Sequence, residues 1–301
     1  MGEDLKHFLV VNPVSGTRKG VKKAAIIQKL LKKYNIYSKV IQSSYKGEIE
    51  KITRELSTKE KCRFYSVGGD GTLNDIVTGI IGTDSEIVVI PAGTGNDFIR
   101  TISDYKSMRK IVIESMKNDV RKVDVIKVSS LKNKYSINIL NAGFDATVAS
   151  NMNKFRRVPL VSGTFKYNLA IFYTLFRNKN YRLKIRVDGK VYKGTYTLIA
   201  IANGKYYGGG VCPAPMADVE DEKLNICMVD KTLVSRKIVL LPKYKKSEHI
   251  GLKEITMEEG KEISVVSNSP FDVSLDGEIY HLNKFKCKLM PKSINVVFTK
   301  K

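Results

Sequence analysis

The sequence predicts an α/β domain with a core of parallel strands, followed by a mainly antiparallel β-sandwich domain. Over the first 120 residues, short apolar runs alternate with helical periodicities, which is typical of parallel strands joined by helices. Beyond Arg121, strand-like runs follow one another, separated by turn signals such as Asp188-Gly189. We therefore predict domains at residues 1–121 and 122–301, with the C-terminal tail able to return to the first domain.

The expected elements follow from the spacing of apolar residues. In the N-terminal domain, we expect strands at His7–Val11, Ile36–Gln42, Cys62–Val67 and Glu86–Ile90, and helices at Val21–Tyr34, Glu48–Leu56 and Leu73–Ile81. In the C-terminal domain, we expect strands at Val123–Val128, Tyr135–Asn141, Tyr181–Val187, Thr195–Ala202, Leu224–Val229, Glu262–Ser267, Phe271–Leu275 and Ile294–Phe298, and one helix at about Phe165–Arg177.

Composition narrows the class of protein. Hydrophobic residues make up 43% of the 301 residues, which suffices for a normal core, and no apolar run approaches a membrane span. The N-terminus lacks the pattern of a secretory signal, and Lys6 stands where a myristoylation motif requires Ser or Thr. The four cysteines form no CxxC pair, which disfavours a zinc site. We expect a cytoplasmic protein.

The chain is strongly basic, since 52 Lys and Arg against 30 Asp and Glu give a net charge of +22. Such an excess attracts nucleic acid, anionic membranes or nucleotide phosphates, but it is also compatible with a solvated surface. The stretch from Lys154 to Arg186 mixes basic and aromatic residues, as an amphipathic segment resting on an anionic leaflet would. Because no RNP, KH or zinc motif is present, we do not expect nucleic-acid binding.

Two glycine-rich strings carry the strongest functional signal. The first glycine loop (residues 67–74, Val-Gly-Gly-Asp-Gly-Thr-Leu-Asn) lies between an expected strand and an expected helix, where a helix N-terminus favours phosphate. Thr72 is placed to cap that helix, and Asp70 suggests an intervening Mg²⁺ or water network. The second glycine loop (residues 91–98, Pro-Ala-Gly-Thr-Gly-Asn-Asp-Phe) follows the next strand.

A third loop, residues 12–18, leaves the first strand, so all three loops lie where open α/β sheets bind ligands. No GxxxxGK[ST] string exists, and no GxGxxG occupies the first strand–helix turn. A P-loop enzyme and a Rossmann dinucleotide site are therefore disfavoured.

These loops, together with the strings at residues 141–145 (Asn-Ala-Gly-Phe-Asp) and 275–278 (Leu-Asp-Gly-Glu), resemble the diacylglycerol kinase catalytic-domain superfamily, in particular the bacterial lipid kinases. The resemblance covers essentially the whole chain. The string Gly-Gly-Asp-Gly-Thr alone is shared with NAD kinases, whereas residues 12–16 and 275–278 are similar to the lipid branch.

The resemblance implies an active site in the cleft between the two domains, with ATP as co-substrate and Mg²⁺. The positions similar to nucleotide contacts are Asn12, Ser15, Ser44, Gly68, Gly69, Gly71, Thr72, Gly93, Thr94 and Asn96. Asp70, Asp97 and Asp124 match acidic positions linked through water to the catalytic Mg²⁺. Asp276 matches the catalytic base, and Glu278 is its neighbour in the site.

Physical chemistry supports the same role for Asp276, because a lipid hydroxyl is a poor nucleophile that a carboxylate can activate. The alternative interpretation of Asp276-Gly277 is a two-residue hairpin turn. A structural Mg²⁺ site is implied near residues 215–224, where Asp221 fits a ligand position and the carbonyls of Asp218 and Lys223 fit two others. Met216 and Glu222 depart from the family pattern there, replacing Asp and Gly.

The sequence thus predicts an ATP-dependent lipid kinase of phospholipid metabolism, with diacylglycerol as the expected acceptor, held peripherally at the inner face of the cell membrane. A sphingoid base, phosphatidylglycerol or undecaprenol stays open as acceptor. An NAD kinase, or a non-catalytic regulator that binds lipid or nucleic acid, is a more distant alternative. A homodimer is compatible with the sequence. Lys154, Arg156, Arg157 and Lys166 are the basic residues expected to face the membrane.

Overall fold

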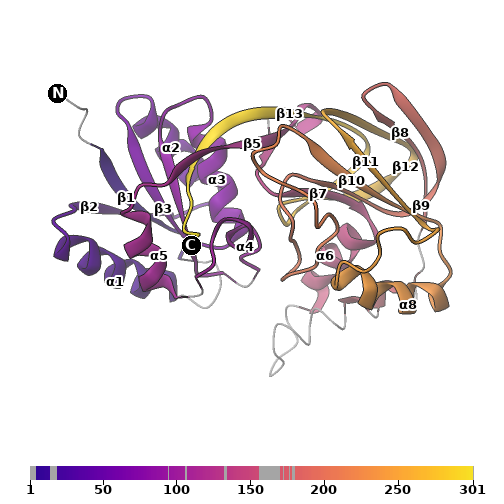
Figure 1. Cartoon of the computed structure of the whole chain (residues 1–301), viewed down its shortest axis with the longest axis horizontal. Coiled ribbons are helices and arrows are strands. Elements are labelled where there is room, and N and C mark those ends of the chain that lie inside the picture. The colour runs from indigo at the N-terminus through magenta and orange to yellow at the C-terminus, as the bar shows by residue number, and fades with distance from the viewer. Residues whose placement is uncertain are drawn as a thin grey trace. The chain divides into compact units, whose positions relative to one another are not determined.

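The computed structural model describes residues 5–13, 19–93, 95–105, 107–131, 134–155, 170–171, 173–175, 177 and 180–300 (Figure 1). The chain forms two compact units, which we describe separately. The N-terminal unit comprises Met1–Val125 and Met290–Lys301, and the β-sandwich unit comprises Ile126–Leu289. The chain passes between them within β5 (Val120–Val128) and β13 (Glu278–Val297), so the predicted boundary near Arg121 falls inside a strand.

The sheet of the N-terminal unit is parallel. Its strands are β1 (Lys6–Val11), β2 (Ser38–Gln42), β3 (Cys62–Gly68) and β4 (Glu86–Pro91), in the order β2-β1-β3-β4, and the end of β13 pairs in parallel with β4. All seven residues of β3 are buried, as expected for a strand covered on both faces. The edge strand β2 is mostly exposed and carries Lys39.

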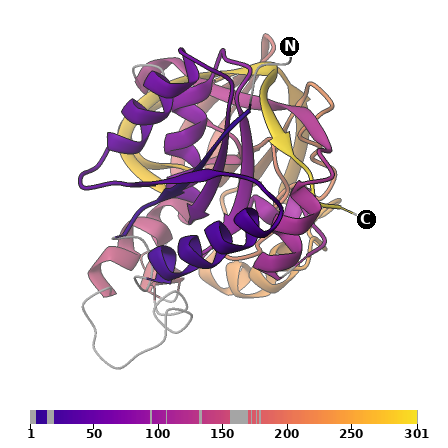
Figure 2. The same ribbon diagram turned by 90° about the vertical axis from the view of Figure 1, so that its left-hand side faces the viewer.

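Helices cover both faces of this sheet (Figure 2). On one face, α2 (Glu48–Ser57) packs against α3 (Asp70–Ile80). On the other face, α1 (Lys19–Lys33) packs against α5 (Met108–Ser115), and the short helix α4 (Ile99–Ile102) follows β4. The strands end in register, because Val11 pairs with Gln42 and Val67, and Gly68 pairs with Pro91. The three loops that leave β1, β3 and β4 therefore begin at one edge of the sheet.

The β-sandwich unit is antiparallel. Its other elements are the 3₁₀ helix η1 (Ser129–Leu131), β6 (Lys134–Ser136), β7 (Ile139–Gly143), α6 (Phe144–Phe155), β8 (Tyr181–Val187), β9 (Lys190–Ala202), β10 (Leu224–Asp230), α8 (Val234–Lys245), β11 (Ile255–Gly260) and β12 (Glu262–Leu275). The long strands β9 and β12 each pair with both β7 and β8, so they belong to both layers of the sandwich.

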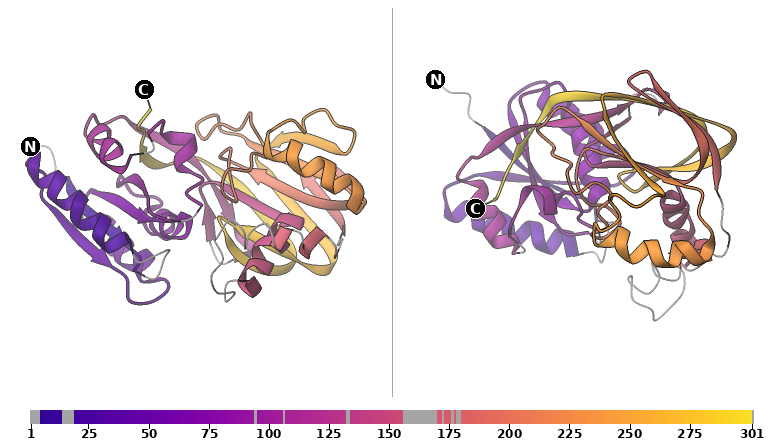
Figure 3. Two further views of the ribbon diagram at one scale, coloured as in Figure 1. Left: turned by 90° about the horizontal axis from the view of Figure 1, so that it is seen from below. Right: turned by 45° about the vertical axis from the view of Figure 1, so that its right-hand side comes forward.

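Two apolar clusters hold this unit together. Alternate residues of β9, such as Ile199 and Ile201, enter the cluster between the layers, which also contains Phe271 and Phe285. The intervening residues, such as Leu198, face a second cluster beneath helices α6 and α8. Figure 3 shows these two helices on the same side of the strands. The alternation follows from the two-residue period of a strand.

Several predicted elements need correction. The strand predicted at Tyr135–Asn141 is broken into β6 and β7, and the two strands predicted at Glu262–Ser267 and Phe271–Leu275 form one strand with a register shift, β12. The sequence also missed α4, α5, α6, α8 and β11. Much of the helix predicted at Phe165–Arg177 lies outside the described residues, although residues 170–171, 173–175 and 177 are helical. No helix in the described part of the chain combines the length and apolarity that crossing a membrane requires.

Candidate active site

The first glycine loop connects β3 to α3 and fixes where that helix begins. Gly69 is the N-cap residue of α3, and no side chain caps the helix there. The prediction that Thr72 is the cap was therefore wrong. Thr72 instead lies within the first turn, where it is buried and its hydroxyl has no hydrogen-bond partner among the described residues.

The second glycine loop is joined to the first by backbone contacts. The Gly68 carbonyl accepts hydrogen bonds from the Ala92 and Gly93 amides, at 2.9 and 3.0 Å. A Cβ atom on Gly93 would overlap the Cα atom of Gly69, so the two loops approach too closely for any side chain at that position. Two of the predicted nucleotide-contact positions, Gly69 and Gly93, are thus brought together at the edge of the sheet.

Asp70 ties the same two loops together through its carboxylate. Its two oxygens accept hydrogen bonds from the Asn96 and Asp97 amides, each at 3.1 Å. Burial raises the pKa of the Asp70 carboxyl above its usual value, and these backbone donors oppose that rise. Sequence reasoning assigned Asp70 to a metal network but missed this structural role, because the hydrogen bonds come from residues 26 and 27 positions away.

A second carboxylate lies close to Asp70. A Cβ atom on Gly95 would stand 2.7 Å from Asp70 Oδ2 and 3.2 Å from Asp97 Oδ2, so the two carboxylates flank one point of the backbone. Asp97 is buried, and its Oδ1 lies 3.7 Å from Arg100 Nε. Paired carboxylates of this kind fit a hard cation such as Mg²⁺.

The other predicted positions in this unit are more scattered. Asn12 follows β1 and is partly buried, whereas Ser44 is exposed and its amide donates a 2.5 Å hydrogen bond to Glu48. Asn96, which has a positive φ of 51°, closes the second loop by bonding to both the amide and the carbonyl of Gly93. Asp124 is buried on β5 and accepts the Lys292 amide at 2.8 Å. Ser15 and Thr94 lie outside the described residues.

In the β-sandwich unit, the Asp276 carboxylate is held by three hydrogen bonds. Ser136 Oγ donates to Oδ1 at 2.7 Å, and the amides of Ile137 and Ile139 donate to Oδ2 and Oδ1, each at 3.0 Å. Asn203 steadies this segment, since its amide group donates to the Ile137 carbonyl at 2.7 Å. The side chain of Asp276 is therefore fixed in one orientation.

The turn that carries Asp276 is also a tight hairpin. Asp276 and Gly277 have φ of 46° and 91°, and Leu275 pairs with Glu278 across them. The hairpin interpretation and the functional one are thus compatible. Asp276 remains partly exposed, while the Glu278 carboxylate at the start of β13 accepts a 2.8 Å hydrogen bond from the Tyr280 hydroxyl.

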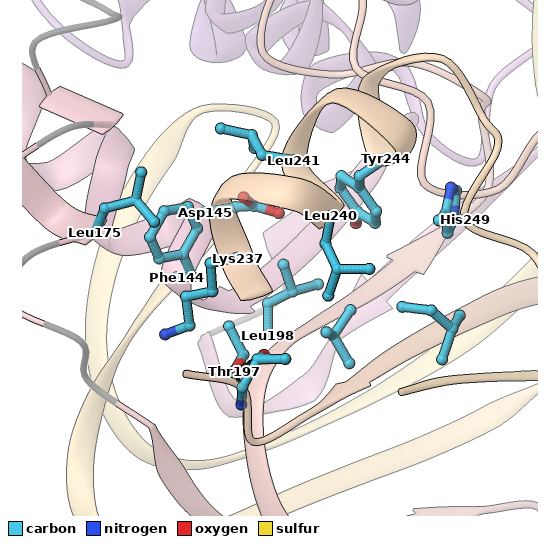
Figure 4. A pocket seen from close by; sticks show the side chains of 13 residues that line it. Phe144, Asp145, Leu175, Thr197, Leu198, Lys237, Leu240, Leu241, Tyr244 and His249 are labelled. Atoms are coloured by element: carbon cyan, nitrogen blue, oxygen red, sulfur yellow. Dashed lines mark hydrogen bonds between the residues drawn. The ribbon is translucent and has the colours of Figure 1, made fainter. Parts of the chain in front are cut away.

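The same unit contains a small apolar pocket, with a cavity volume of about 40 Å³, partly open to solvent (Figure 4). Leu240, Leu241 and Tyr244 reach into it from α8, facing Phe144 and Leu198. Asp145 and Lys237 are two of the ionisable side chains that line it. Burial raises the pKa of the Asp145 carboxyl to about 6, opposed by a hydrogen bond from the Tyr207 hydroxyl, and burial lowers the pKa of the Lys237 ammonium to about 8.

Comparison with known proteins decides the family. Residues 6–128 match the model of the "Diacylglycerol kinase catalytic domain". Residues 138–298, more than half of the chain, match the model of the "YegS C-terminal NAD kinase beta sandwich-like domain". The chain belongs to the diacylglycerol kinase catalytic-domain superfamily.

Several known proteins are similar to this superfamily member over most of its length. A Staphylococcus aureus protein (strain MSSA476) named "Putative lipid kinase" is 27% identical over 85% of this chain and 84% of its own. A Bacillus anthracis crystal structure titled as "a putative diacylglycerol kinase" has a TM-score of 0.78 and 22% identity, covering 98% and 97% of the two chains. An Archaeoglobus fulgidus NAD kinase in complex with ATP has the same fold more distantly, with a TM-score of 0.53 and 15% identity over 97% and 93%.

The acidic loop predicted to hold a structural metal contains a residue in the left-handed backbone region. Glu222, which replaces the family glycine, adopts a positive φ of 59°. Asp218 Oδ1 and Asp221 Oδ1 accept hydrogen bonds from the Glu220 and Lys223 amides, each at 3.0 Å. Nowhere in the described ranges do three or more His, Cys, Asp or Glu side chains gather as a metal site, so metal binding here would depend on backbone carbonyls.

Proposed function

We propose that this chain is an ATP-dependent lipid kinase that transfers the γ-phosphate of ATP to the free hydroxyl of diacylglycerol, forming phosphatidic acid and ADP. The observation that carries the proposal is the Asp276 carboxylate, held by three donors on a partly exposed turn. A general base must be held in a fixed orientation toward the proton that it removes, and the three donors supply such an orientation to this carboxylate. The enzyme would act in the cytoplasm, at the inner face of the membrane.

The proposed step is an in-line displacement. The lipid hydroxyl oxygen attacks the γ-phosphorus, the bond from that phosphorus to the β–γ bridging oxygen breaks, and ADP leaves. Asp276 takes the proton from the hydroxyl as the new phosphorus–oxygen bond forms. Because transfer of a phosphoryl group depends mostly on alignment and charge neutralisation, a fixed carboxylate needs to contribute little more than orientation and proton acceptance.

The two glycine loops are the proposed ATP site. The backbones of the two loops come close together because Gly69 and Gly93 have no side chain. The N-terminus of α3, where the first loop ends, favours a phosphate. The carboxylates of Asp70 and Asp97 lie on either side of the Gly95 backbone and fit a water-linked Mg²⁺. Asp124 is a further candidate for a water-linked contact to this ion. When bound, Mg²⁺ neutralises phosphate charge. The NAD kinase of similar fold was solved in complex with ATP, which supports nucleotide binding by a protein of this fold.

The apolar pocket beneath α8 supports a lipid acceptor. Its lining is mostly aliphatic and aromatic, which suits an acyl chain better than a dinucleotide. Diacylglycerol is the acceptor that we propose, and the other lipids named above are distinguished from it by experiment.

The test is a product analysis with the full chain. Purified protein, [γ-³²P]ATP and Mg²⁺ are incubated in parallel with vesicles containing diacylglycerol, a sphingoid base, phosphatidylglycerol or undecaprenol, and with NAD. We expect labelled phosphatidic acid from the first, and no turnover by Asp276→Asn, which keeps the shape of the side chain but cannot accept the proton. ATP affinity, measured by isothermal titration, should be nearly unchanged in this variant.

Each other outcome would change the assignment. Label in a different lipid would replace diacylglycerol as acceptor. Label in NADP alone would make the chain an NAD kinase, and no label in any acceptor would contradict a catalytic role. Turnover by Asp276→Asn at the wild-type rate would remove Asp276 as the base.

A further inference from the structure

Helix α8 distributes its side chains in an unusual way. Lys237 is buried, with 5% of its surface exposed, and its ammonium lies 5.6 Å from the centre of the Phe144 ring. Its neighbours Ile238 and Val239 are 56% and 50% exposed. A helix that only needed to cover the sheet would place its aliphatic residues inward and its lysine outward.

The two faces of α8 therefore differ in what they contact. Leu240 and Tyr244 point into the apolar pocket (Figure 4), whereas Ile238 and Val239 face solvent. Leu233, just before the helix, is 68% exposed. Single exposed aliphatic residues are ordinary, but Ile238 and Val239 are adjacent on the outer side of α8, and this exposed apolar pair needs an explanation.

The charge along this helix is predominantly positive, between the flanking acidic residues Asp230 and Glu248. Residues 231–246 contain six basic side chains and no acidic one. At the end of the helix, Lys245 and Lys246 are exposed. Arg236 is paired with Glu254, at 2.7 Å. Exposed aliphatic residues bordered by lysines are the composition of helices that lie in the interface of an anionic bilayer.

We propose that the outer face of α8, formed by Ile238, Val239, Lys245 and Lys246, docks reversibly on an anionic phospholipid bilayer. The aliphatic residues enter the headgroup region and the lysines contact lipid phosphates. This inference rests on the proposed function, because a kinase whose acceptor stays in the bilayer must contact the membrane surface. The opposite face of the helix lines the pocket, so docking would bring the lipid phase next to it. The earlier candidates Lys154, Arg156, Arg157 and Lys166 lie outside the described side chains.

Helix α1 provides a matched comparison. Its outer face also combines a 55% exposed aliphatic residue, Ile26, with the exposed lysines Lys29 and Lys33. It belongs to the N-terminal unit, and its residues do not line the apolar pocket beneath α8. If vesicle binding depended only on the overall positive charge, substitutions on the two helices would weaken it equally. If α8 is a specific docking face, only the substitutions on α8 would weaken it.

The experiment is co-sedimentation of the full chain with vesicles of phosphatidylcholine, with and without 40% phosphatidylglycerol, over a range of NaCl concentrations and without ATP. The α8 variant is Ile238→Asp with Lys245→Glu and Lys246→Glu, and the α1 variant is Ile26→Asp with Lys29→Glu and Lys33→Glu. Each base near an anionic leaflet contributes about fivefold to partitioning. We expect the α8 variant to bind at least tenfold more weakly, the α1 variant to bind within twofold of wild type, and binding to fall with salt.

Three results would overturn the proposal. They are wild-type binding that does not depend on phosphatidylglycerol, an α8 variant that binds like wild type, and an α1 variant that loses as much binding as the α8 variant. If sedimentation velocity shows a dimer that only the α8 variant dissociates, with vesicle binding unchanged, the face is an interface between copies instead.

Docking and catalysis are separable in this design. The α8 variant should keep wild-type melting and wild-type turnover of a short-chain diacylglycerol in detergent micelles, since its substituted residues lie outside the pocket and the proposed catalytic groups. Vesicle binding through α8 without any lipid phosphorylation would contradict the kinase and retain the docking face. Lipid phosphorylation by a protein whose vesicle binding is unaffected by the α8 substitutions would support the kinase activity and contradict the docking face.

Discussion

The Ser136 hydroxyl donates a 2.7 Å hydrogen bond to Asp276 Oδ1, across 140 residues of sequence. Ser136 ends β6 and is fully buried, and the chain then turns so that the amides of Ile137 and Ile139 reach the same carboxylate. Asp276 is thus oriented by a segment that contains no ionisable group of its own. In the proposed reaction, Ser136 would be a positioning residue for the base.

We predict that Ser136→Ala lowers kcat by about tenfold or more and leaves the ATP dissociation constant unchanged. A hydrogen bond to a charged group contributes about 1.5–3 kcal/mol, and without it the carboxylate has one constraint fewer. Ser136→Thr retains the hydroxyl and should recover most of the activity. Steady-state kinetics with diacylglycerol, together with isothermal titration of ATP, measure both quantities.

A matched control is Ser274→Ala, which removes another buried serine hydroxyl two residues before Asp276 on β12. If Ser274→Ala lowers kcat as much as Ser136→Ala, the effect comes from general loss of packing. If Ser136→Thr folds with wild-type melting and yet stays as slow as Ser136→Ala, the hydroxyl does not position the base.

A second prediction separates the two roles that glycines play in the phosphate loops. Gly93→Ala would force apart the two loops at Gly69, so we expect a loss of about 1–3 kcal/mol in the free energy of unfolding, together with weaker ATP binding. At Gly71, a Cβ atom meets nothing within 4 Å, so Gly71→Ala should melt like wild type. We expect it nevertheless to bind ATP at least tenfold more weakly, because the methyl group occupies space meant for phosphate. Unchanged ATP affinity in Gly71→Ala would place the nucleotide away from the start of α3.

The sequence predicted the N-terminal unit well because its signals are local. Apolar runs and glycine strings lie next to one another along the chain, so β1, β3 and β4 could be placed within one or two residues, and their loops at one edge of the sheet. What holds the loops together could not be predicted. The overlap of Gly93 with Gly69 and the bonds from Asp70 to the second loop depend on tertiary contact alone.

The misses in the β-sandwich unit have similar causes. The run Tyr135–Asn141 alternates like one strand, but the structure breaks it because the Ile137 and Ile139 amides bond to Asp276 instead of to a neighbouring strand. Helix α8 was missed because Lys237 lies inside and Ile238 outside, with Pro242 near the end of the helix. That inversion conceals the usual helical period and is the same feature from which we infer membrane docking.

A third prediction concerns the acidic loop at residues 218–222. Glu222 holds a left-handed backbone conformation, which costs a residue with a side chain about 1–2 kcal/mol. We expect Glu222→Gly to raise the free energy of unfolding by about 0.5–1 kcal/mol, since glycine gains freedom in the unfolded chain as well. Glu222→Ala keeps the strain and loses the 3.9 Å contact with Lys261, so it should be neutral or slightly destabilising. Urea unfolding of both variants checks this, and equal stability of the two would mean that the turn carries no strain.

The last prediction uses the pH dependence of Asp145. Burial raises its pKa from 3.8 to about 6 in the folded protein, so between about pH 4 and 6 the folded state binds more protons than the unfolded state. The contribution of Asp145 to stability is therefore fully present below about pH 4 and is lost as the pH rises through 6. An Asp145→Asn variant cannot ionise, and its amide oxygen can still accept the Tyr207 hydrogen bond. We expect it to be more stable than wild type by about 3 kcal/mol at pH 7.5, with the difference falling to about 1 kcal/mol at pH 4.5 and to near zero below about pH 3. Melting temperatures of both proteins across this range measure the effect, and a constant difference would show that the Asp145 carboxyl does not titrate in this window.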